Sequence, residues 1–395
     1  MTDQTNALPA PHMGEPYLLT PGPLTTSYVV KQAMLRDWGS RDYEFRKMTA
    51  DLRTKLLAMA GDTQGDYECV PMQGSGTFSV EAMCGSFLPR DSKTLVLVNG
   101  AYGKRIVKIL AYLNRDTVVI DKGDYLPPRG AEVANALNAD PSISHVIVVH
   151  CETSSGILNP LKEIADAVFG CGRKLLIDSM SAFGALELDV NDIPFTAMVS
   201  SANKCIEGVP GFGFVIARTD ELVAAKGVSH SLSLDLHDQW ASMNKTQQWR
   251  FTPPTHVLAA FLEALRLHEE EGGVKGRGAR YANNRDTLIN GMRELGFETL
   301  LSDEWLAPII LTFFNPAHPN FDFEAFYEGM SEHGFVIYPG KLTVVDSFRI
   351  GCIGRLDHHV MRKAVAAADS VLKGMGVDSA APSDAALSER AKLAA

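Results

Sequence analysis

Short apolar segments alternate with amphipathic ones from Tyr17 to about Gly272, and this alternation limits the possible folds more than any other feature of the chain. The apolar segments are rich in Val, Ile and Leu and are bounded by Gly, Asn, Asp or Ser; the best five are residues 94–99, 145–150, 174–178, 197–200 and 213–217. Such runs are typical of strands that are buried on both faces. The amphipathic segments predict helices at residues 26–35, 48–60, 79–87, 104–113, 161–169 and 257–271. We therefore expect an α/β fold in which a mostly parallel central sheet lies between helices.

The pattern changes after residue 272. The second block predicts helices at residues 279–295, 323–333 and 358–374 and strands at residues 307–314, 335–338 and 347–351. This order predicts a smaller α+β domain that packs on the first. The expected division of the chain is a flexible N-terminal arm, a large α/β domain, a small α+β domain and a weakly ordered Ala/Ser-rich tail, at residues 1–16, 17–272, 273–376 and 377–395 respectively.

The charge balance and the cysteine pattern argue against several classes of protein. The 395 residues carry a formal net charge of −10, which gives no reason to expect binding to nucleic acid or to an anionic membrane. No apolar segment approaches the roughly 20 residues that span a bilayer, and the N-terminus lacks the basic and apolar regions of a signal peptide. The six cysteines are scattered without a CxxC pair, so we predict no metal site and expect a reducing cytoplasm.

Two polar residues stand where predicted strands end. Asp178 ends the run LLID, and Lys204 follows the next strand in the run SSANK. Ligands of open α/β sheets gather beyond the carboxyl ends of the strands. A lysine buried there has a lowered pKa, so that its neutral amine can attack a carbonyl group. The residues alone leave two plainer interpretations open, since Asp178 could cap a helix and Lys204 could lie on a surface loop.

A third polar segment, QGSGT at residues 73–77, leads into the predicted helix at 79–87. Small residues let backbone N–H groups approach an anion, and a helix N-terminus adds positive potential. Ser75, Gly76 and Thr77 would then form a phosphate cradle. The segment is neither a Walker A loop nor a GxGxxG motif, and taken alone it is more commonly an ordinary turn.

Together the three motifs describe one cofactor. A phosphate at the Ser75–Thr77 loop, a carboxylate at Asp178 facing a pyridine nitrogen, and a Schiff base with Lys204 are the parts that pyridoxal 5'-phosphate requires. We therefore predict a pyridoxal-phosphate enzyme with Lys204 and Asp178 as its catalytic residues.

The order of these motifs resembles that of the fold-type I pyridoxal-phosphate enzymes and, more narrowly, of the class V aminotransferases. Within that class the chain looks most like the enzymes that transfer the amino group of 2-aminoethylphosphonate to pyruvate. The most specific part is SSANKCIEGVPGF at residues 200–212. The other matching segments are LLTPGPLTT (18–26), NGAYG (99–103), SLSLDL (231–236), WRFT (249–252), GFVIYPGK (334–341) and FRIG (348–351).

The resemblance implies further cofactor contacts. Tyr102 would stack on the pyridine ring, and Thr153 would hydrogen-bond the phenolic oxygen. Thr252 would reach the phosphate held by the neighbouring subunit of a homodimer. Without the resemblance, Tyr102 is equally well explained as a core aromatic, and the two threonines as loop residues. The implied phosphate contacts within one chain are Ser75, Gly76, Thr77, Ser201 and Asn203.

One arginine of the small domain is the implied substrate ligand. The resemblance places Arg349 against the acid group of the substrate, because a guanidinium fork suits a carboxylate or a phosphonate. A structural ion pair is the alternative. Arg41, near the N-terminal segment, is a weaker candidate for a second cation, since an ordinary surface charge explains it better.

The reaction that the resemblance implies is pyridoxal-phosphate-dependent transamination of 2-aminoethylphosphonate with pyruvate, which gives phosphonoacetaldehyde and L-alanine. Two alternatives keep the cofactor: a lyase acting on hydroxylated aminoethylphosphonate, and an aminotransferase of the alanine–glyoxylate type. A third is a non-catalytic α/β binding protein with an ancestral pocket. The joint presence of Lys204, Asp178 and the Ser75–Thr77 loop argues against that third alternative.

Overall fold

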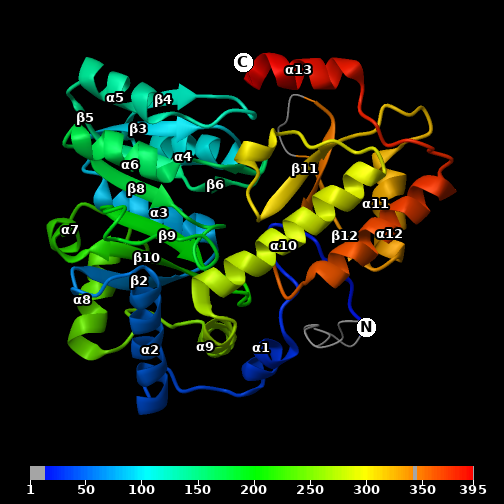
Figure 1. Cartoon of the computed structure of the whole chain (residues 1–395). Coiled ribbons are helices and arrows are strands. Elements are labelled where there is room, and N and C mark those ends of the chain that lie inside the picture. The colour runs from blue at the N-terminus through cyan, green and yellow to red at the C-terminus, as the bar shows by residue number, and fades with distance from the viewer. Residues whose placement is uncertain (1–13, 341–344, 395) are drawn as a thin grey trace.

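The computed structural model describes residues 14–340 and 345–394. Figure 1 shows two domains beside each other, a large one around a seven-stranded sheet and a small one around a three-stranded sheet. Most of the expected flexible arm, residues 1–13, lies outside the described residues, as does Lys341 of the matching segment at 334–341.

The large sheet is mostly parallel, as the sequence predicts. In spatial order its strands are β2 (Tyr67–Gln73), β10 (Phe212–Arg218), β9 (Ala197–Ser201), β8 (Lys174–Asp178), β5 (Ile143–Val149), β3 (Lys93–Val98) and β4 (Asp116–Asp121). The five strands from β9 to β4 run parallel, and β10 pairs antiparallel with both β9 and β2. The two strands that the sequence did not reveal, β2 and β4, are the two edges.

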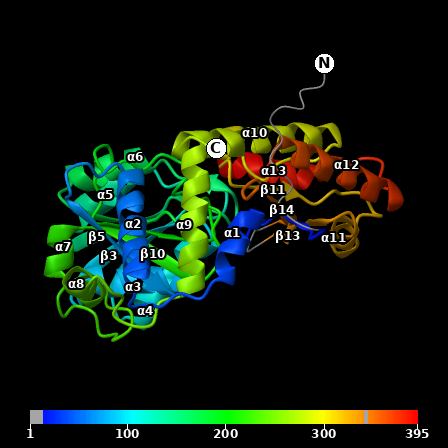
Figure 2. The same cartoon turned by 90° about the horizontal axis from the view of Figure 1, so that it is seen from below.

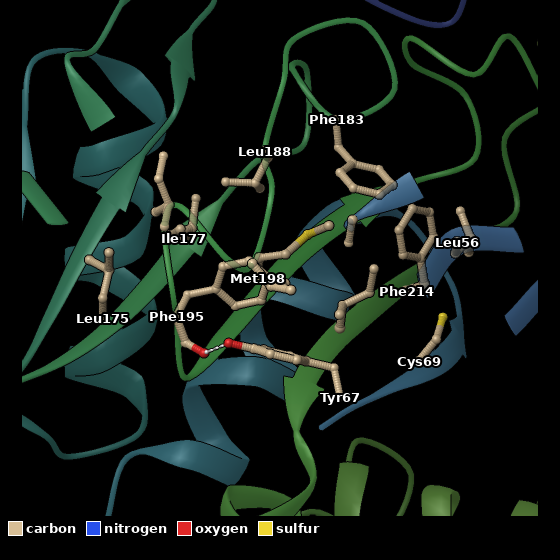
Figure 3. Close-up of a cluster of buried hydrophobic side chains, with 14 of the residues drawn as sticks. Leu56, Tyr67, Cys69, Leu175, Ile177, Phe183, Leu188, Phe195, Met198 and Phe214 are labelled. Carbon is tan, nitrogen blue, oxygen red and sulfur yellow. Dashed lines mark hydrogen bonds between the residues drawn. The ribbon is translucent and has the colours of Figure 1, made fainter. Parts of the chain in front are cut away.

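Side chains along each central strand alternate between two hydrophobic cores. Leu175 and Ile177 of β8 face one core, whereas Leu176 faces the other. The first core is drawn in Figure 3, where the Tyr67 hydroxyl donates to the Phe195 carbonyl oxygen at 3.1 Å. Helices α2 (Tyr43–Met59), α5 (Gly130–Ala139), α6 (Leu161–Gly170) and α9 (Thr255–Glu270) cover this core, and α3 (Gly76–Phe87), α4 (Ala101–Tyr112) and α7 (Thr219–Ala224) cover the second. Helix α8 (Leu236–Thr246) packs at the β2 edge.

The small domain has its own core. Its antiparallel sheet has the order β11 (Ile310–Phe314), β14 (Ser347–Gly351) and β13 (Tyr338–Pro339), and its main helices are α10 (Gly273–Glu294), α11 (Phe323–Glu332) and α12 (His358–Gly374). Helix α10 starts at the end of α9 and carries the chain from the large domain to the small one (Figures 1 and 2).

The N-terminal segment belongs to the small domain, whereas we expected residue 17 to begin the large one. Strand β1 (Tyr17–Leu18) pairs parallel with β12 (Phe335–Val336), and Leu19 is fully buried in the small-domain core. The Tyr17 and Phe335 rings stack with their centroids 5.7 Å apart. The chain then crosses to helix α1 (Tyr28–Gln32) and the short 3₁₀ helix η1 (Ala33–Leu35), which pack on α9.

The C-terminal tail is folded, contrary to the expectation of weak order. Residues 384–394 form helix α13 (Asp384–Ala394). Leu387 packs against a small cluster formed by Tyr125 of the large domain and by Leu300 and Phe314 of the small one, and Arg390 Nη1 donates to the Thr299 carbonyl oxygen at 2.7 Å. The Ala/Ser-rich composition gave no indication of this docking site, because residues far away in the sequence form it.

Candidate active site

A cavity of about 450 Å³ opens at the carboxyl ends of the central strands. Its volume lies within the range of about 300–1,000 Å³ that is typical of small-molecule and cofactor sites. Parallel strands that end at one edge, together with the N-termini of α3 and α4, converge on it. The residues predicted for the site that line this cavity are Ser75, Gly76, Thr77, Tyr102, Thr153, Asp178, Ser201, Asn203 and Lys204.

Lys204 lies just after β9, with its side chain half-buried in the cavity wall. Its Nζ donates to the carbonyl oxygen of Pro21 at 2.6 Å. Burial lowers the pKa of Lys204 to about 8, and the positive charges of Arg105 and Arg349 act in the same direction. A much larger fraction of the amine is therefore neutral near pH 7 than for a solvated lysine, which suits it to attack a carbonyl carbon.

Asp178 ends β8 and is buried in the same cavity. Its Oδ1 accepts a hydrogen bond from the Met180 backbone N–H at 3.0 Å. Burial raises the pKa of Asp178 to about 6, while Arg105 and Lys204 work against that rise. Because desolvation makes the carboxylate costly on its own, a protonated ring nitrogen beside it would be a favourable partner.

The loop before α3 presents backbone N–H groups to the cavity. Ser75 is the N-cap of α3, and its side chain makes no capping hydrogen bond. Gly74 has φ +119°, a conformation that residues with a side chain rarely adopt, and its N–H donates to the Gly211 carbonyl oxygen at 3.0 Å. The uncapped helix N-terminus leaves N–H donors and the positive end of the helix dipole available to an anion.

A buried carboxylate orders the wall that carries Tyr102 and Thr153. Glu152, on β6 (Cys151–Glu152), is fully buried and accepts hydrogen bonds from the backbone N–H groups of Tyr102 and Gly103 at 3.0 and 3.2 Å. Its other oxygen accepts from the Ser154 backbone and side chain. The N-terminus of α4 and the loop after β6 are thus held together by one side chain.

Arg349 reaches this wall from the small domain. It lies on β14, buried, with Nη1 donating to the Thr153 carbonyl oxygen at 2.9 Å and Nε to the Pro339 carbonyl oxygen at 3.0 Å. Its guanidinium stands over the Tyr338 ring, 5.5 Å from the centroid. Arg349 is not part of the cavity lining itself, but it lies directly behind Thr153, which is.

Two predicted residues are not brought to the cavity. Thr252 lies exposed in the loop between α8 and α9, and Arg41 lies exposed just before α2. Within one chain, neither residue is part of the cavity lining.

The sequence reasoning missed two groups at the site. Arg105 lines the cavity, its Nη1 donates to Thr77 Oγ1 at 3.1 Å, and its guanidinium stands 4.9 Å from the Tyr102 ring centroid. It lies three residues after Tyr102 on one helix, and this spacing could have pointed to it. The Pro21 carbonyl oxygen could not have been found in this way, because its contact with Lys204 spans 183 residues.

These residues fit pyridoxal phosphate. The cavity supplies an amine with a lowered pKa, a buried carboxylate, an aromatic ring and a loop of small residues before a helix, and each matches one part of that cofactor.

Comparison with known families agrees with this chemistry. The family model described as Aminotransferase class-V matches residues 106–330. The chain is 74% identical to the 2-aminoethylphosphonate–pyruvate transaminase of Rhizobium meliloti (strain 1021), over 97% of this chain and 100% of that protein. It is 68% identical to 2-aminoethylphosphonate–pyruvate transaminase 1 of Paraburkholderia xenovorans (strain LB400), over 97% of this chain and 99% of that protein.

Solved structures share the architecture at low sequence identity. Pyridoxamine–pyruvate aminotransferase from Mesorhizobium loti aligns with a TM-score of 0.84 at 22% identity, over 98% of this chain and 100% of that one. Ureidoglycine–glyoxylate aminotransferase from Bacillus subtilis also gives 0.84, at 18% identity over 97% of this chain and 99% of that one. The predicted fold-type I architecture is therefore confirmed.

Proposed function

The chain belongs to the class-V aminotransferase family, and on that basis we propose that it transfers the amino group of 2-aminoethylphosphonate to pyruvate. The products are phosphonoacetaldehyde and L-alanine. The structural observation that carries the proposal is that Lys204 and Asp178 line one cavity, with Arg349 directly behind its wall. The phosphonate substrate comes from the relatives that are 74% and 68% identical along nearly their whole length.

The enzyme depends on pyridoxal phosphate, which supplies the electron sink that lets the carbon bearing an amino group lose a proton. Lys204 has two tasks in the proposed reaction. Its neutral amine would hold the cofactor at the aldehyde group, and with substrate bound the free Nζ would take up the proton that the amine-bearing carbon loses and carry it to the cofactor. The lowered pKa of Lys204, about 8, keeps Nζ able to accept this proton near neutral pH.

Three further side chains would orient the cofactor ring. The Asp178 carboxylate would face the ring nitrogen and keep it protonated. Tyr102 would lie against the ring face, and the Thr153 hydroxyl would donate to the phenolic oxygen. The Glu152 carboxylate supports both, because it binds the N–H of Tyr102 and the residue after Thr153.

The phosphate of the cofactor would bind at the loop before α3 and at the end of β9. We assign it to Ser75, Gly76, Thr77, Ser201 and Asn203, all of which line the cavity. The Ser201 hydroxyl donates to Asn203 Oδ1 at 3.2 Å, so that these two side chains are already held next to each other.

Arg349 would bind the acid group of each substrate. The phosphonate of the donor and the carboxylate of pyruvate would use the same guanidinium in turn, since one site serves both halves of a transamination. Its fixed position, held by the Thr153 and Pro339 carbonyl oxygens, favours a substrate of defined length.

We infer a homodimer in which Thr252 completes the phosphate site of the neighbouring subunit. Large apolar side chains beside both loops support this assembly: Phe78 is 52% exposed, Leu232 71% and Phe251 48%. Phe78 follows the proposed phosphate loop, and Phe251 precedes Thr252. Light scattering after gel filtration should give twice the mass of the chain.

The proposed compartment is the cytoplasm. No helix among the described residues has the length and apolar character needed to cross a bilayer. All six cysteines are free thiols, five of them buried, which suits a reducing compartment.

The experiment that tests the function is a donor panel with purified protein, pyridoxal phosphate and pyruvate. We expect L-alanine to form with 2-aminoethylphosphonate, and at far lower rates with taurine or serine. Lys204→Ala should bind the cofactor without a borohydride-reducible bond and give no turnover. Normal turnover in that variant would contradict the proposal, and ammonia release without pyruvate from the hydroxylated substrate would point to the lyase.

A further inference from the structure

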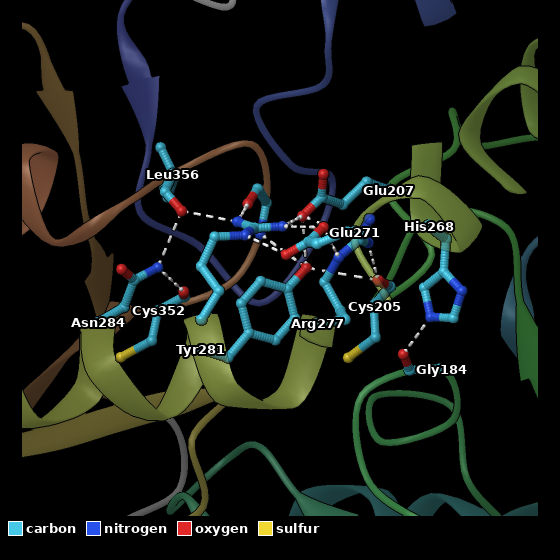
Figure 4. A network of polar contacts seen from close by, with 12 residues as sticks. Gly184, Cys205, Glu207, His268, Glu271, Arg277, Tyr281, Asn284, Cys352 and Leu356 are labelled. Carbon is cyan, nitrogen blue, oxygen red and sulfur yellow. Dashed lines mark hydrogen bonds and ion pairs between the residues drawn. The ribbon is translucent and has the colours of Figure 1, made fainter. Parts of the chain in front are cut away.

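A buried cluster of two carboxylates and two guanidinium groups lies at Cys205 and Glu207, which directly follow Lys204 in the chain (Figure 4). Arg280 donates from Nη2 to Glu207 at 2.7 Å and from Nε to Glu271 at 2.6 Å. Arg277, whose side chain is fully buried, donates from Nε to Glu271 at 2.7 Å. The cluster is neutral as a whole, and the reaction proposed above uses none of its members.

The cluster holds the Lys204 turn from behind. The backbone N–H of Glu207 donates to the Lys204 carbonyl oxygen at 2.8 Å, and Arg277 Nη1 donates to the carbonyl oxygen of Cys205. Glu207 has φ +64°, an unfavourable conformation for a residue other than glycine. Such a conformation persists only where the surroundings impose it, and here the Tyr281 hydroxyl donates to Glu207 Oε1 at 2.6 Å.

The same cluster is also hydrogen-bonded to the small domain. Arg280 Nη1 donates to the carbonyl oxygens of Gly354 and Leu356 at 2.7 and 2.6 Å. Asn284, one turn further along α10, donates from Nδ2 to the Leu356 carbonyl oxygen at 3.0 Å. These carbonyl groups lie in the segment that directly follows β14, the strand that carries Arg349.

A second connection runs in front of Lys204. The backbone N–H of Arg355 donates to the Thr25 carbonyl oxygen at 2.8 Å. In the N-terminal segment that contains Thr25, the Pro21 carbonyl oxygen accepts the hydrogen bond from Lys204 Nζ. Residues 352–356 are therefore tied to Lys204 on both sides, through Glu207 behind it and through the N-terminal segment in front.

We propose that the Glu207–Arg280 pair, acting together with the Arg349–Thr153 hydrogen bond, fixes the distance between Lys204 and Arg349 and thereby selects the length of the substrate. This rests on the proposed function, in which Lys204 acts at the carbon bearing the amine and Arg349 binds the phosphonate. The two groups stand on different domains, so the joint between the domains sets how many carbons fit between them. A buried ion pair suits this task, because its strict geometry specifies one arrangement even where an apolar contact would be as stable.

The test is the chain-length selectivity of Glu207→Gln. The measured quantity is kcat/KM for 2-aminoethylphosphonate divided by kcat/KM for 3-aminopropylphosphonate, each with pyruvate. We expect that ratio to fall by about tenfold in the variant, within the range of specificity that one methylene group confers. A general loss of stability would lower both values and leave the ratio unchanged.

Two further variants complete the experiment. Glu68→Gln breaks the ion pair with Arg53 on the edge strand β2, away from the Lys204 turn, and should leave the ratio as in the wild type. Tyr281→Phe removes the hydroxyl that donates to Glu207 and accepts from the Gly354 N–H, but keeps the Glu207–Arg280 pair, and it should shift the ratio in the same direction by less. If Glu207→Gln does not fold, the ratio measured for Tyr281→Phe tests the inference by itself. A wild-type ratio in Tyr281→Phe and in any folded Glu207→Gln would overturn the inference, whereas a wild-type enzyme inactive on 2-aminoethylphosphonate would overturn the proposed function instead.

Discussion

Lys204 and Pro21 are joined by a hydrogen bond of 2.6 Å from Nζ to the carbonyl oxygen, although 183 residues separate them in the chain. Gly22 makes this approach possible. A Cβ built on Gly22 would lie 2.6 Å from Lys204 Nζ, and the residue has φ +124°. The N-terminal segment thus contacts Lys204 directly, and a methyl group at residue 22 is enough to displace the Lys204 side chain.

Gly22→Ala should therefore displace Lys204 and lower kcat by about 10²-fold, since a misplacement of about 1 Å can cost that much. Gly65→Ala is the matched control: it has φ +78° but no atom within 4 Å of its Cβ position, so it shares the strain without the clash. Steady-state kinetics of the two variants give the comparison. Equal losses in both would assign the effect to backbone strain rather than to Lys204.

The reactivity of Lys204 should depend on pH with a midpoint near 8. Burial lowers the pKa of Lys204 from 10.5 to about 8, so about half of the amine is neutral at that pH. The neutral fraction falls as pH drops below about 8 and approaches one as pH rises above it. The rate at which apoprotein captures pyridoxal phosphate, followed by absorbance in a stopped-flow instrument, should rise with pH and then level off. Free Nα-acetyl-lysine, measured in parallel, removes the titration of the reagent itself. A rate for the protein that still climbs like that of the free amino acid above pH 9 would contradict the lowered pKa.

Arg349→Lys should weaken substrate binding more than it slows the chemistry. A lysine keeps the charge but loses the fork that binds two oxygens at once. Hydrogen bonds to charged groups contribute about 1.5–3 kcal/mol, so KM for 2-aminoethylphosphonate and for pyruvate should rise roughly tenfold to a hundredfold. Cofactor absorbance should be unchanged. An unaltered KM for both substrates would show that another group binds the acid.

Arg105→Ala should lower affinity for the cofactor through its phosphate. Arg105 and Lys204 are the two cationic residues in the described lining of the cavity, and Arg105 is hydrogen-bonded to Thr77 on the proposed phosphate loop. A phosphate monoester carries about −1.5 to −2 charges at pH 7, which the loop alone does not balance. Equilibrium binding of pyridoxal phosphate should weaken by about tenfold or more. Binding of pyridoxal, which lacks the phosphate, serves as the control and should hardly change; equal weakening of both would instead indicate a role through the Tyr102 ring.

The elements buried on both sides could be predicted from the sequence, and the edges could not. Strand β8 and helix α12 begin and end where the apolar pattern places them. Strand β4 is half-exposed, so its pattern is not that of a buried strand. Strand β2 contains Pro71, which argues against a strand unless it lies at an edge, where one side needs no hydrogen bonds.

The site divides in a similar way. Short local motifs at strand ends contain Lys204, Asp178 and the loop at 74–77. The sequence alone therefore predicts that these residues share one site. The roles of Pro21, Gly22 and the Glu207–Arg280 pair depend on contacts between distant parts of the chain. Such contacts cannot be predicted from the local pattern of a single sequence.

The pairing of β1 with β12 has a consequence for the order in which the protein matures. The segment that contacts Lys204 through Pro21 is made before the large domain, but its strand partner, Phe335–Val336, is made after the large domain. The large domain can complete its sheet much earlier, since its last strand ends at Arg218. We therefore expect a nascent chain to fold its cofactor-binding half while Lys204 still lacks its hydrogen-bond partner, and to position Lys204 firmly only after Phe335 and Val336 have been made.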